Sequence, residues 1–353
     1  MKLLHLICAV RPNFMKIAPL YHALQQETWC DVKIIHTGQH YDYALSDTFF
    51  KDLGLSSPDY SLGIGSGSHA EQTANTMLAY EKICINTHPD LVIVVGDVNA
   101  TMSCALVAKK LNLPVAHLEA GLRSFDRAMP EEINRIVTDS ISDYFWTPSE
   151  DADVNLLKEG ISSDKIFRVG NIMIDAYCLL EKKIKKRSYY ENLFLEQKKY
   201  VVLTLHRPSN VDDHDILQPL MDIIGKINLP IVFPVHPRAK KNLMNIKNIS
   251  DRVMLVDPLS YVDFMSLVLT SSYVISDSGG IQEETTYLGI PCFTLRTTTE
   301  RPVTVTMGSN QLVNKDNLLE KVSSPRIGKI PPLWDGKTST RIVSVLKNMF
   351  EVS

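Results

Sequence analysis

Short apolar runs rich in β-branched residues recur along the whole chain, and mixed segments of helical length separate them. Most of these runs are apolar throughout and do not alternate with polar residues. Such strands are typical of parallel sheets covered by helices on both faces. The pattern therefore predicts two doubly wound parallel α/β domains. The predicted strands are LLHLICA (3–9), VKIIHTG (32–38), LVIVVGD (91–97), PVAHLEA (114–120), YFWTP (144–148), IFRVGN (166–171), YVVLTLH (200–206), IVFPVHP (231–237), VMLVDP (253–258), YVISDSG (273–279), PCFTLR (291–296) and NQLVN (310–314).

The length of 353 residues exceeds one ordinary core and fits two domains with a cleft. The join is predicted near 169–171, which gives an N-terminal domain of residues 1–170 and a C-terminal domain of residues 171–338. Residues 339–353 are predicted to form a last helix with no following strand. Packing on either domain stays open, and we interpret this helix as returning to the N-terminal domain.

Composition excludes several classes of function. The formal net charge is −3 without a dominant Lys/Arg stripe, so we expect no nucleic-acid partner. No segment approaches the about 18 apolar residues of a membrane span, so no membrane partner is expected, and the apolar N-terminus is predicted to be a buried strand. The six cysteines lack CxxC spacing, which indicates reduced core residues of a cytoplasmic protein and no metal site. The basic run 182–187 (KKIKKR) is predicted to be a solvated helix end.

Ligands of open parallel sheets bind beyond the carboxyl ends of the strands, so motifs directly after the predicted strands are candidate sites. In SDSGGIQEE (276–284), Gly279 and Gly280 permit close backbone approach, Ser278 adds a hydroxyl, and the N–H groups of the following helix favour phosphate. A simple turn with Ser or Asp as the helix cap is the alternative. One turn later, Glu283 or Glu284 would accept hydrogen bonds from a ribose diol or stabilise the first helical turn. No P-loop or dinucleotide fingerprint occurs, and we expect no cofactor.

Arginine and two acidic residues occupy further strand ends. Arg11 follows the first strand, where its forked donors suit phosphate or a structural ion pair. Asp97 ends LVIVVGD and Glu119 ends PVAHLE. A helix cap at about Asn99 is the alternative for Asp97.

Histidines end two strands of the second half, and a charged helix start follows Glu119. His206 is followed directly by an arginine, which favours an anion site, whereas His236 is interpreted as a satisfied polar group. Neither has metal-ligand spacing. A helix is predicted to begin at Pro130, with Arg135 one turn beyond Glu131 or its neighbour.

Taken together, these motifs resemble the non-hydrolysing UDP-N-acetylglucosamine 2-epimerase family, whose members have the two-domain, Rossmann-like glycosyltransferase-B fold. The resemblance runs over nearly the whole chain. The order and number of the motifs make it specific, whereas any one motif alone would be a weak signal. The matching motifs are RPNFMKIAPL (11–20), TGQHYD (37–42), VVGDVNAT (94–101), HLEAGLRSFDRAMPEEINR (117–135), VGNIMIDA (169–176), LHRPSNVD (205–212), PVHP (234–237), SDSGGIQEE (276–284) and TTERPVT (298–304).

The resemblance implies roles for single residues. The implied catalytic group is Asp97, Glu119, Glu131 and His206. The residues implied to hold UDP are Arg11, Arg135, Ser278, Gly279, Gly280 and Glu284, with Phe264 near the uracil.

The resemblance implies C2 epimerisation of UDP-N-acetylglucosamine through elimination of UDP and re-addition to a 2-acetamidoglucal. The C2 hydrogen is hardly acidic until the C1–O bond loosens, and the resulting oxocarbenium-like species requires nearby anions. Inversion requires acid/base groups on both faces of the ring. A hydrolysing 2-epimerase, a 2-epimerase of a modified UDP-2-acetamido sugar, a glycosyltransferase and a non-catalytic nucleotide-sugar sensor are the alternatives. A UDP-sugar ligand, a homodimer and cleft closure on UDP are further expectations.

Overall fold

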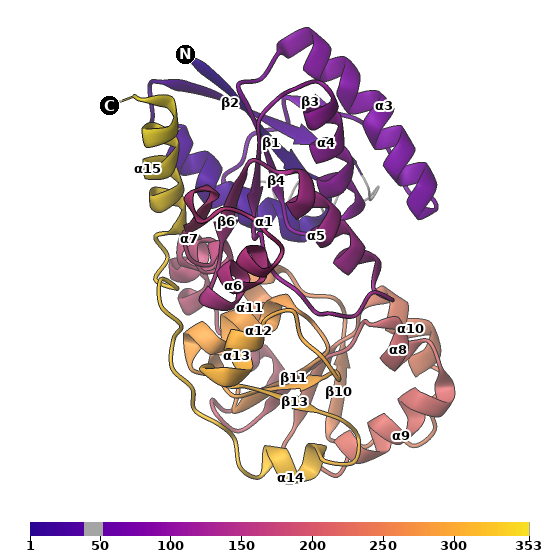
Figure 1. The fold of residues 1–353 in the computed structure, drawn as a ribbon. Coiled ribbons are helices and arrows are strands. Elements are labelled where there is room, and N and C mark those ends of the chain that lie inside the picture. The colour runs from indigo at the N-terminus through magenta and orange to yellow at the C-terminus, as the bar shows by residue number, and fades with distance from the viewer. Residues whose placement is uncertain (39–51, 353) are drawn as a thin grey trace. The chain divides into compact units, whose positions relative to one another are not determined.

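The computed structural model describes residues 1–38 and 52–352, apart from the side chain of Arg11. Most of the TGQHYD motif (37–42) therefore lies outside the described residues. The chain divides into two compact units. Unit 1 comprises 1–179 and 332–353, and unit 2 comprises 180–331 (Figure 1).

Unit 1 is built on a parallel sheet whose described strands run in the order β3-β2-β1-β4-β5-β6-β7. The sequence is apolar on both faces of these strands because helices cover both sides, and the five residues of β4 are all buried. The elements of unit 1 are β1 (Lys2–Cys8), α1 (Arg11–Leu24), β2 (Cys30–His36), β3 (Tyr60–Ser61), α3 (His69–Thr87), β4 (Leu91–Val95), α4 (Asn99–Lys110), β5 (Val115–Leu118), α5 (Pro130–Ile141), β6 (Tyr144–Thr147), α6 (Glu150–Lys158), η1 (Ser163–Lys165), β7 (Ile166–Arg168), the first part of α7 (Ile172–Lys186) and α15 (Thr338–Phe350).

Unit 2 repeats this plan with a second parallel sheet in the order β10-β9-β8-β11-β12-β13. Its core is formed by side chains of β8, β9 and β11 together with the buried face of α9. The elements of unit 2 are the last part of α7, η2 (Tyr189–Leu193), β8 (Val201–Thr204), α8 (Pro208–Val211), α9 (His214–Ile224), β9 (Ile231–Pro234), α10 (Pro237–Leu243), β10 (Val253–Val256), α11 (Tyr261–Thr270), β11 (Tyr273–Ser276), α12 (Gly280–Leu288), β12 (Cys292–Leu295), α13 (Pro302–Thr306), β13 (Asn310–Val313) and α14 (Leu318–Val322).

All twelve strands predicted from the sequence are present, and the N-terminal apolar run forms β1 as expected. The additional strand is β3, which has only two residues. The units divide between Leu179 and Leu180, inside α7, whereas the sequence pattern placed the join at 170. The first half of α7 is apolar and buried in unit 1, as at Ile172 and Ile174, so the helix starts as part of that core.

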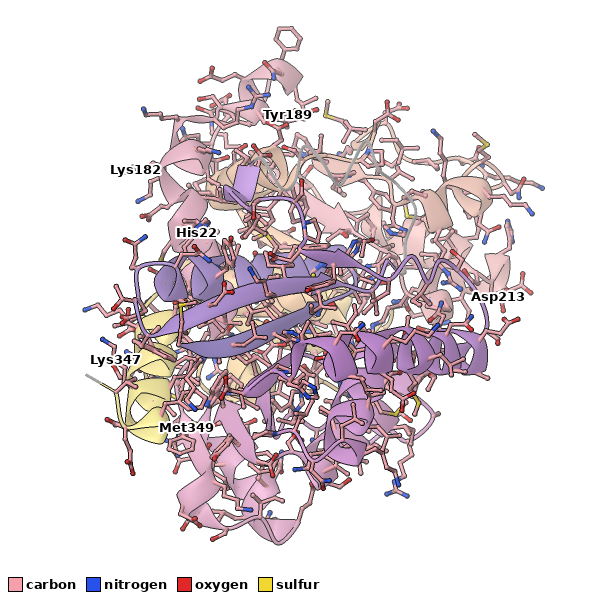
Figure 2. The ribbon with its side chains drawn as sticks, turned by 90° about the horizontal axis from the view of Figure 1, so that it is seen from above. His22, Lys182, Tyr189, Asp213, Lys347 and Met349 are labelled. Carbon is pink, nitrogen blue, oxygen red and sulfur yellow. The ribbon has the colours of Figure 1, made fainter. Side chains whose placement is uncertain are left out.

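The C-terminal segment belongs to unit 1 from residue 332 onward. Asp175 on α7 accepts the backbone N–H groups of Thr338 and Ser339 at 3.0 and 2.7 Å, which caps α15. Lys347, labelled on α15 in Figure 2, pairs with Glu27 at 2.9 Å. α15 therefore lies against α1.

Three predictions made from the composition concern the basic run 182–187, membrane spans and the cysteines. Lys182, also labelled in Figure 2, begins the exposed basic end of α7. No helix among the described residues is long and apolar enough to cross a membrane. Five of the six cysteines are buried, and Cys178 is half-buried.

Candidate active site

Two acidic side chains leave the sheet of unit 1 at the ends of neighbouring strands. Asp97 follows β4 and Glu119 follows β5, and these strands pair in parallel. Glu119 is buried and has a φ of +70°, a backbone conformation that is uncommon outside glycine and concentrates at functional sites. Helix α4 begins at Asn99 without any side-chain cap. Asp97 is therefore not the cap of α4, and its half-buried carboxylate serves another contact.

Lys16 is the counter-ion of Glu119. Its buried Nζ on α1 contacts Oε2 of Glu119. Gly96, with a φ of +69°, lies beside this pair: a Cβ there would be 3.2 Å from Lys16 Nζ and 3.5 Å from Glu119 Oε2. Glu119 Oε1 is buried without a hydrogen-bond partner among the described residues. Oε2 of Glu119 therefore faces an ammonium group, whereas Oε1 accepts no hydrogen bond from the described residues.

Arg135 on α5 joins two carboxylates of unit 1. Its Nη1 donates to Asp97 Oδ2, and its Nε and Nη2 donate to Glu132 Oε2 at 2.9 and 2.5 Å. Glu132 also accepts the backbone N–H groups of Ser124 and Phe125 at 3.0 and 2.8 Å. Burial alone would raise the pKa of Glu132, but the Ser124 amide and the Arg135 guanidinium bring this pKa below its ordinary value. The helical pair to Arg135 is thus formed by Glu132 at i,i+3, and the loop after Glu119 is fixed to α5.

Glu131 lies in the first turn of α5, where it is exposed. Pro130 takes the first helical position, as expected. Asn134 on the same helix donates to the backbone oxygen of Asp97 at 2.9 Å and to Asn99 Oδ1 at 3.2 Å. The start of α5 is therefore tied to the Asp97 loop.

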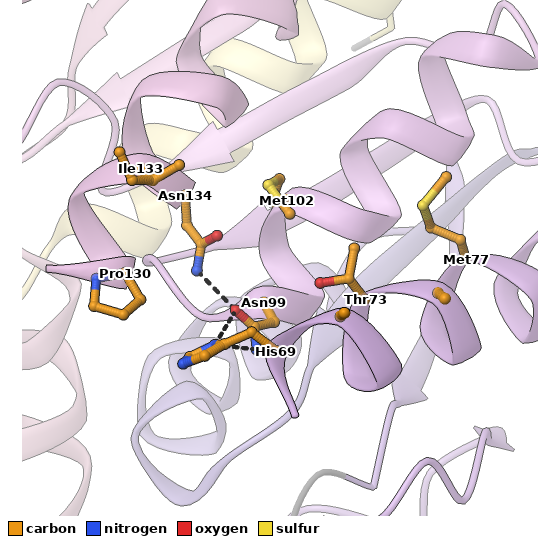
Figure 3. A pocket seen from close by; sticks show the side chains of 10 residues that line it. His69, Thr73, Met77, Asn99, Met102, Pro130, Ile133 and Asn134 are labelled. Carbon is orange, nitrogen blue, oxygen red and sulfur yellow. Dashed lines mark hydrogen bonds between the residues drawn. The ribbon is translucent and has the colours of Figure 1, made fainter. Parts of the chain in front are cut away.

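A hollow of about 550 Å³ lies between α3, α4 and α5, and Asn134 is one of its lining residues (Figure 3). His69, Asn99 and Asn134 form its polar end, and Met77, Met102 and Ile133 line the rest. The walls are mostly apolar, and none of the acidic candidates lines the hollow. Its surface therefore does not suit a diphosphate, and the candidate chemistry lies elsewhere in unit 1.

In unit 2, His206 is held by a buried aspartate. Its Nδ1 lies 2.9 Å from Asp277 Oδ1, and its backbone N–H faces both carboxylate oxygens at 3.1 Å. Asp277 also accepts from Arg207 N at 2.9 Å and Asn210 Nδ2 at 3.0 Å. Burial opposes ionisation of Asp277, yet the His206 ring and these amides keep its pKa below the ordinary value. The half-exposed His206 ring is therefore oriented with Nε2 away from Asp277.

The ring of His236 lies near that of His206, with centroids 5.6 Å apart and planes tilted by 47°. Its Nδ1 accepts the backbone N–H of Arg238 at 3.2 Å, which caps α10. The interpretation of His236 as a satisfied polar group agrees with this cap.

The glycine pair begins α12, whose N-terminus has no side-chain cap. Neither Ser278 nor Asp277 therefore caps this helix with its side chain. A Cβ at Gly279 would lie 2.7 Å from Glu300 Oε1 and 3.1 Å from Arg301 Nη1, whereas a Cβ at Gly280 would meet nothing within 4 Å. Gly279 is thus required by packing, and Gly280 leaves space open at the helix start.

Glu284 is buried on α12, and the hydroxyl of Tyr261 donates to its Oε1 at 2.5 Å. Burial raises the pKa of Glu284 to about 7, a shift that the Tyr261 hydroxyl opposes and the charge of Glu283 reinforces. Glu283 pairs with Arg301 at 2.8 Å. Phe264 follows Tyr261 by three residues on α11, so the two rings share a helix face. Glu284, Tyr261 and Phe264 are thereby placed in one neighbourhood of unit 2.

Within unit 1 the structure joins Asp97, Glu119 and Arg135 through the loops described above, and Glu131 lies on the same helix as Arg135. Within unit 2, Asp277 contacts His206, Ser278 directly follows Asp277, and Glu284 lies on the helix that begins at Gly280. Arg11 begins α1, and its side chain is outside the described part of the structure.

Sequence reasoning missed Lys16 and Asp277. The available signals were a lysine inside the apolar stretch FMKIA (14–18) and an aspartate directly after β11. Among the described residues, no group of three or more His, Cys, Asp or Glu is arranged to hold a metal ion.

Comparison with known proteins identifies the family. The model of the UDP-N-acetylglucosamine 2-epimerase family matches residues 22–347. The chain belongs to this family. The UDP-N-acetylglucosamine 2-epimerase of Methanocaldococcus jannaschii is 42% identical, and the similarity covers 97% of this chain and 98% of that relative.

Solved structures of UDP-N-acetylglucosamine 2-epimerases share the fold. The crystal structure of the Methanocaldococcus jannaschii UDP-GlcNAc 2-epimerase in complex with UDP-GlcNAc and UDP has a TM-score of 0.90 and 41% identity, covering 99% of this chain and 100% of that chain. The expected fold class, two doubly wound parallel α/β units of the glycosyltransferase-B type, is confirmed.

One similar protein is named for a modified sugar. A UDP-2,3-diacetamido-2,3-dideoxy-D-glucuronate 2-epimerase of Pseudomonas aeruginosa is 38% identical, over 99% of this chain and 100% of that relative.

Proposed function

We propose that this protein interconverts UDP-N-acetylglucosamine and UDP-N-acetylmannosamine by elimination and re-addition of UDP, without net hydrolysis. The observation that carries the proposal is the pair Asp97 and Glu119 on adjacent strand ends, with Lys16 on one oxygen of Glu119 and its other oxygen unpartnered among the described residues. Family membership supports the substrate.

In the forward reaction, a carboxylate of unit 1 takes the C2 proton while the C1–O bond breaks and its electron pair leaves with UDP. A C1–C2 double bond forms, giving the 2-acetamidoglucal. In the return step, an oxygen of UDP adds to C1 and a proton is delivered to the opposite face of C2. Asp97, Glu119 and Glu131 supply the acid and base, and the nearby anions stabilise positive charge at C1. Which carboxylate removes the proton and which returns it stays open.

Unit 2 retains the UDP while it is detached. The uncapped N-terminus of α12, with Ser278 and Gly280, offers N–H groups to the diphosphate, and His206 stabilises the leaving group. Glu284 accepts the ribose hydroxyls, and Phe264 contacts the uracil. The proposed contacts of Arg11 are with the diphosphate. In this structure Arg135 pairs with Asp97 and Glu132, so a direct contact of Arg135 with UDP would require it to exchange a partner.

Proton NMR of the purified protein with UDP-N-acetylglucosamine in deuterated water tests the proposal. The expected result is deuterium at C2 together with UDP-N-acetylmannosamine. Release of free N-acetylmannosamine and UDP would instead indicate a hydrolysing 2-epimerase. A Glu119→Gln variant is the matched control, because it keeps the size of the side chain while removing the base, and it should bind UDP normally without exchange.

A modified UDP-2-acetamido sugar is the second candidate substrate, favoured by the 38% identity to the Pseudomonas aeruginosa relative. The same NMR experiment with UDP-2,3-diacetamido-2,3-dideoxy-D-glucuronate compares the two. Faster exchange at C2 of this sugar than of UDP-N-acetylglucosamine would assign the protein to the modified substrate.

We also infer a homodimeric cytoplasmic enzyme, as the family resemblance implies. Light scattering after size exclusion measures the mass directly. A mass equal to the 39.7 kDa of one chain would contradict the dimer.

A further inference from the structure

His117 is a buried histidine that the proposed chemistry does not use. It lies in β5, with its ring excluded from solvent. Its Nδ1 is 2.6 Å from Asp139 Oδ1, and its Nε2 is 2.8 Å from the backbone oxygen of Gly96. A carbonyl oxygen and an ionised carboxylate are acceptors only, so both ring nitrogens donate and the ring carries a proton on each.

Asp139 on α5 extends this network to the loop that follows β5. Its Oδ2 accepts the backbone N–H of Gly121 at 3.1 Å and lies 2.7 Å from Arg123 Nη1. Burial opposes the charge on Asp139, but His117 and Arg123 keep its pKa below the ordinary value. Arg123 is itself held by Glu159 at 2.8 and 2.6 Å. The aspartate is therefore an ionised, fully engaged acceptor.

The network fastens the backbone beside both candidate carboxylates. Gly96 directly precedes Asp97, and its N–H also donates to the oxygen of Leu118 at 3.0 Å. His117 and Gly121 stand two residues before and two residues after Glu119. A non-glycine residue at a φ of +70°, as at Glu119, is strained and persists only where surrounding contacts enforce it.

We propose that His117 and Asp139 are positioning residues that together fix the separation of Asp97 and Glu119 for proton transfer. This inference rests on the proposed function. The physical reason is that proton removal on one face of C2 and return on the other tolerates little displacement, since a misplacement of about 1 Å can cost about 100-fold in rate. Neither side chain is exposed to a substrate, so each acts through the two loops it holds.

His117→Gln tests the role. The glutamine amide group can donate to Asp139 or to the Gly96 oxygen, but it cannot place one donor at each of the two ring-nitrogen positions. The matched control is His5→Gln. His5 is also a buried strand histidine, in β1, and its Nδ1 lies 3.1 Å from the hydroxyl of Tyr80. His5 contacts neither the backbone next to Asp97 nor the backbone next to Glu119. His5→Gln is therefore expected to lower stability without moving these two carboxylates.

For His117→Gln we expect kcat for C2 exchange to fall at least tenfold, while KM and the dissociation constant of UDP change less than twofold. The split is expected because most of the proposed UDP contacts belong to unit 2, whereas the positioning network belongs to unit 1 and does not include Arg11. His117→Phe, with no donor, should lower kcat further, and Asp139→Asn should match His117→Gln. His5→Gln should retain kcat within twofold even if its melting temperature falls equally.

A second measurement does not depend on any variant folding. In wild-type protein with ¹⁵N-labelled histidine, NMR should show protons on both ring nitrogens of His117, because each nitrogen faces an acceptor. A neutral ring, or full kcat in folded His117→Gln, would overturn the positioning role while leaving the proposed function intact. Wild-type protein without any C2 exchange would overturn the proposed function, and with it the role assigned to His117 in that reaction.

Discussion

Nδ1 of His206 lies 2.9 Å from Oδ1 of Asp277, a buried residue that also receives the backbone N–H of His206. This contact fixes the direction of the imidazole and places a negative charge behind it. Because Asp277 holds Nδ1, Nε2 is the ring nitrogen that would face a departing diphosphate in the proposed reaction.

Replacement of Asp277 by asparagine should therefore slow turnover. Asp277→Asn removes the charge behind His206, and we expect kcat to fall about 100-fold. Steady-state kinetics of UDP-N-acetylglucosamine epimerisation provide the measurement. Asp222→Asn is the control, since Asp222 is an exposed carboxylate of α9 bonded to Gln218. Equal rates for the two variants would refute a role of Asp277 in leaving-group stabilisation.

UDP affinity should rise with pH through the titration of Glu284. Its pKa is raised to about 7 by burial, and only the ionised carboxylate accepts hydrogen bonds from both ribose hydroxyls. Binding therefore lowers this pKa, and Glu284 contributes an increase in affinity of about tenfold between pH 6 and pH 8. Calorimetric titration with UDP measures it. Glu284→Gln retains only the titration of UDP itself, so identical pH slopes in the variant and the wild type would remove Glu284 from the ribose site.

The same carboxyl should make unliganded protein less stable as pH rises. The folded pKa of about 7 lies above the ordinary value of 4.5, so folding favours the neutral form. The folded state binds more protons than the unfolded chain between these values, and the contribution of Glu284 to the unfolding free energy falls across that window by about 3 kcal/mol. Denaturant unfolding at pH 5 and pH 8 checks the sign. In Glu284→Gln this component of the decline should disappear.

The two glycines of α12 should separate packing from ligand approach. Gly279→Ala pushes on the Glu300–Arg301 pair and should lower stability by about 1–3 kcal/mol. Gly280→Ala enters open space, so its melting temperature should be unchanged or slightly higher. It should nevertheless weaken UDP binding, because the methyl group occupies the approach to the helix N-terminus. Normal UDP affinity in Gly280→Ala would contradict diphosphate binding there.

Lys16 and Glu119 should be coupled in stability but not in activity. Lys16→Met leaves a buried carboxylate without its counter-ion, which costs about 3–5 kcal/mol. Adding Glu119→Gln removes that charge and should restore most of the unfolding free energy, while C2 exchange should be lost, as in Glu119→Gln alone. The double-mutant cycle is measured by denaturant unfolding beside C2 exchange. Additive stabilities would show that the two side chains do not interact.

The fold could be predicted from the sequence because strands buried on both faces form continuous apolar runs, as in LVIVV of β4. Strand β3 was not predictable, since its two residues, Tyr60 and Ser61, are too few to show a period. The division within α7 was also hidden. A helix pattern records which side chains are apolar but not which of two cores receives them.

The position of a candidate residue was predictable where it stands just after a strand, as for Asp97, Glu119 and His206, whereas their roles stay predictions. The site was not predictable where the chemistry depends on pairing between distant segments. Lys16 meets Glu119 across 103 positions, and a lone lysine in an amphipathic helix is usually exposed. For Arg135, the sequence could not choose between a ligand and the carboxylates it contacts.

The division at residues 179 and 332 gives the chain an order of completion during synthesis. Unit 2 is contiguous, from 180 to 331, whereas unit 1 is interrupted by it. Asp175, which caps α15, leaves the ribosome more than 150 residues before Thr338 and Ser339. The side of α1 that contacts α15 therefore stays uncovered in the nascent chain until the last segment emerges. Unit 2 can complete its folding before unit 1 does.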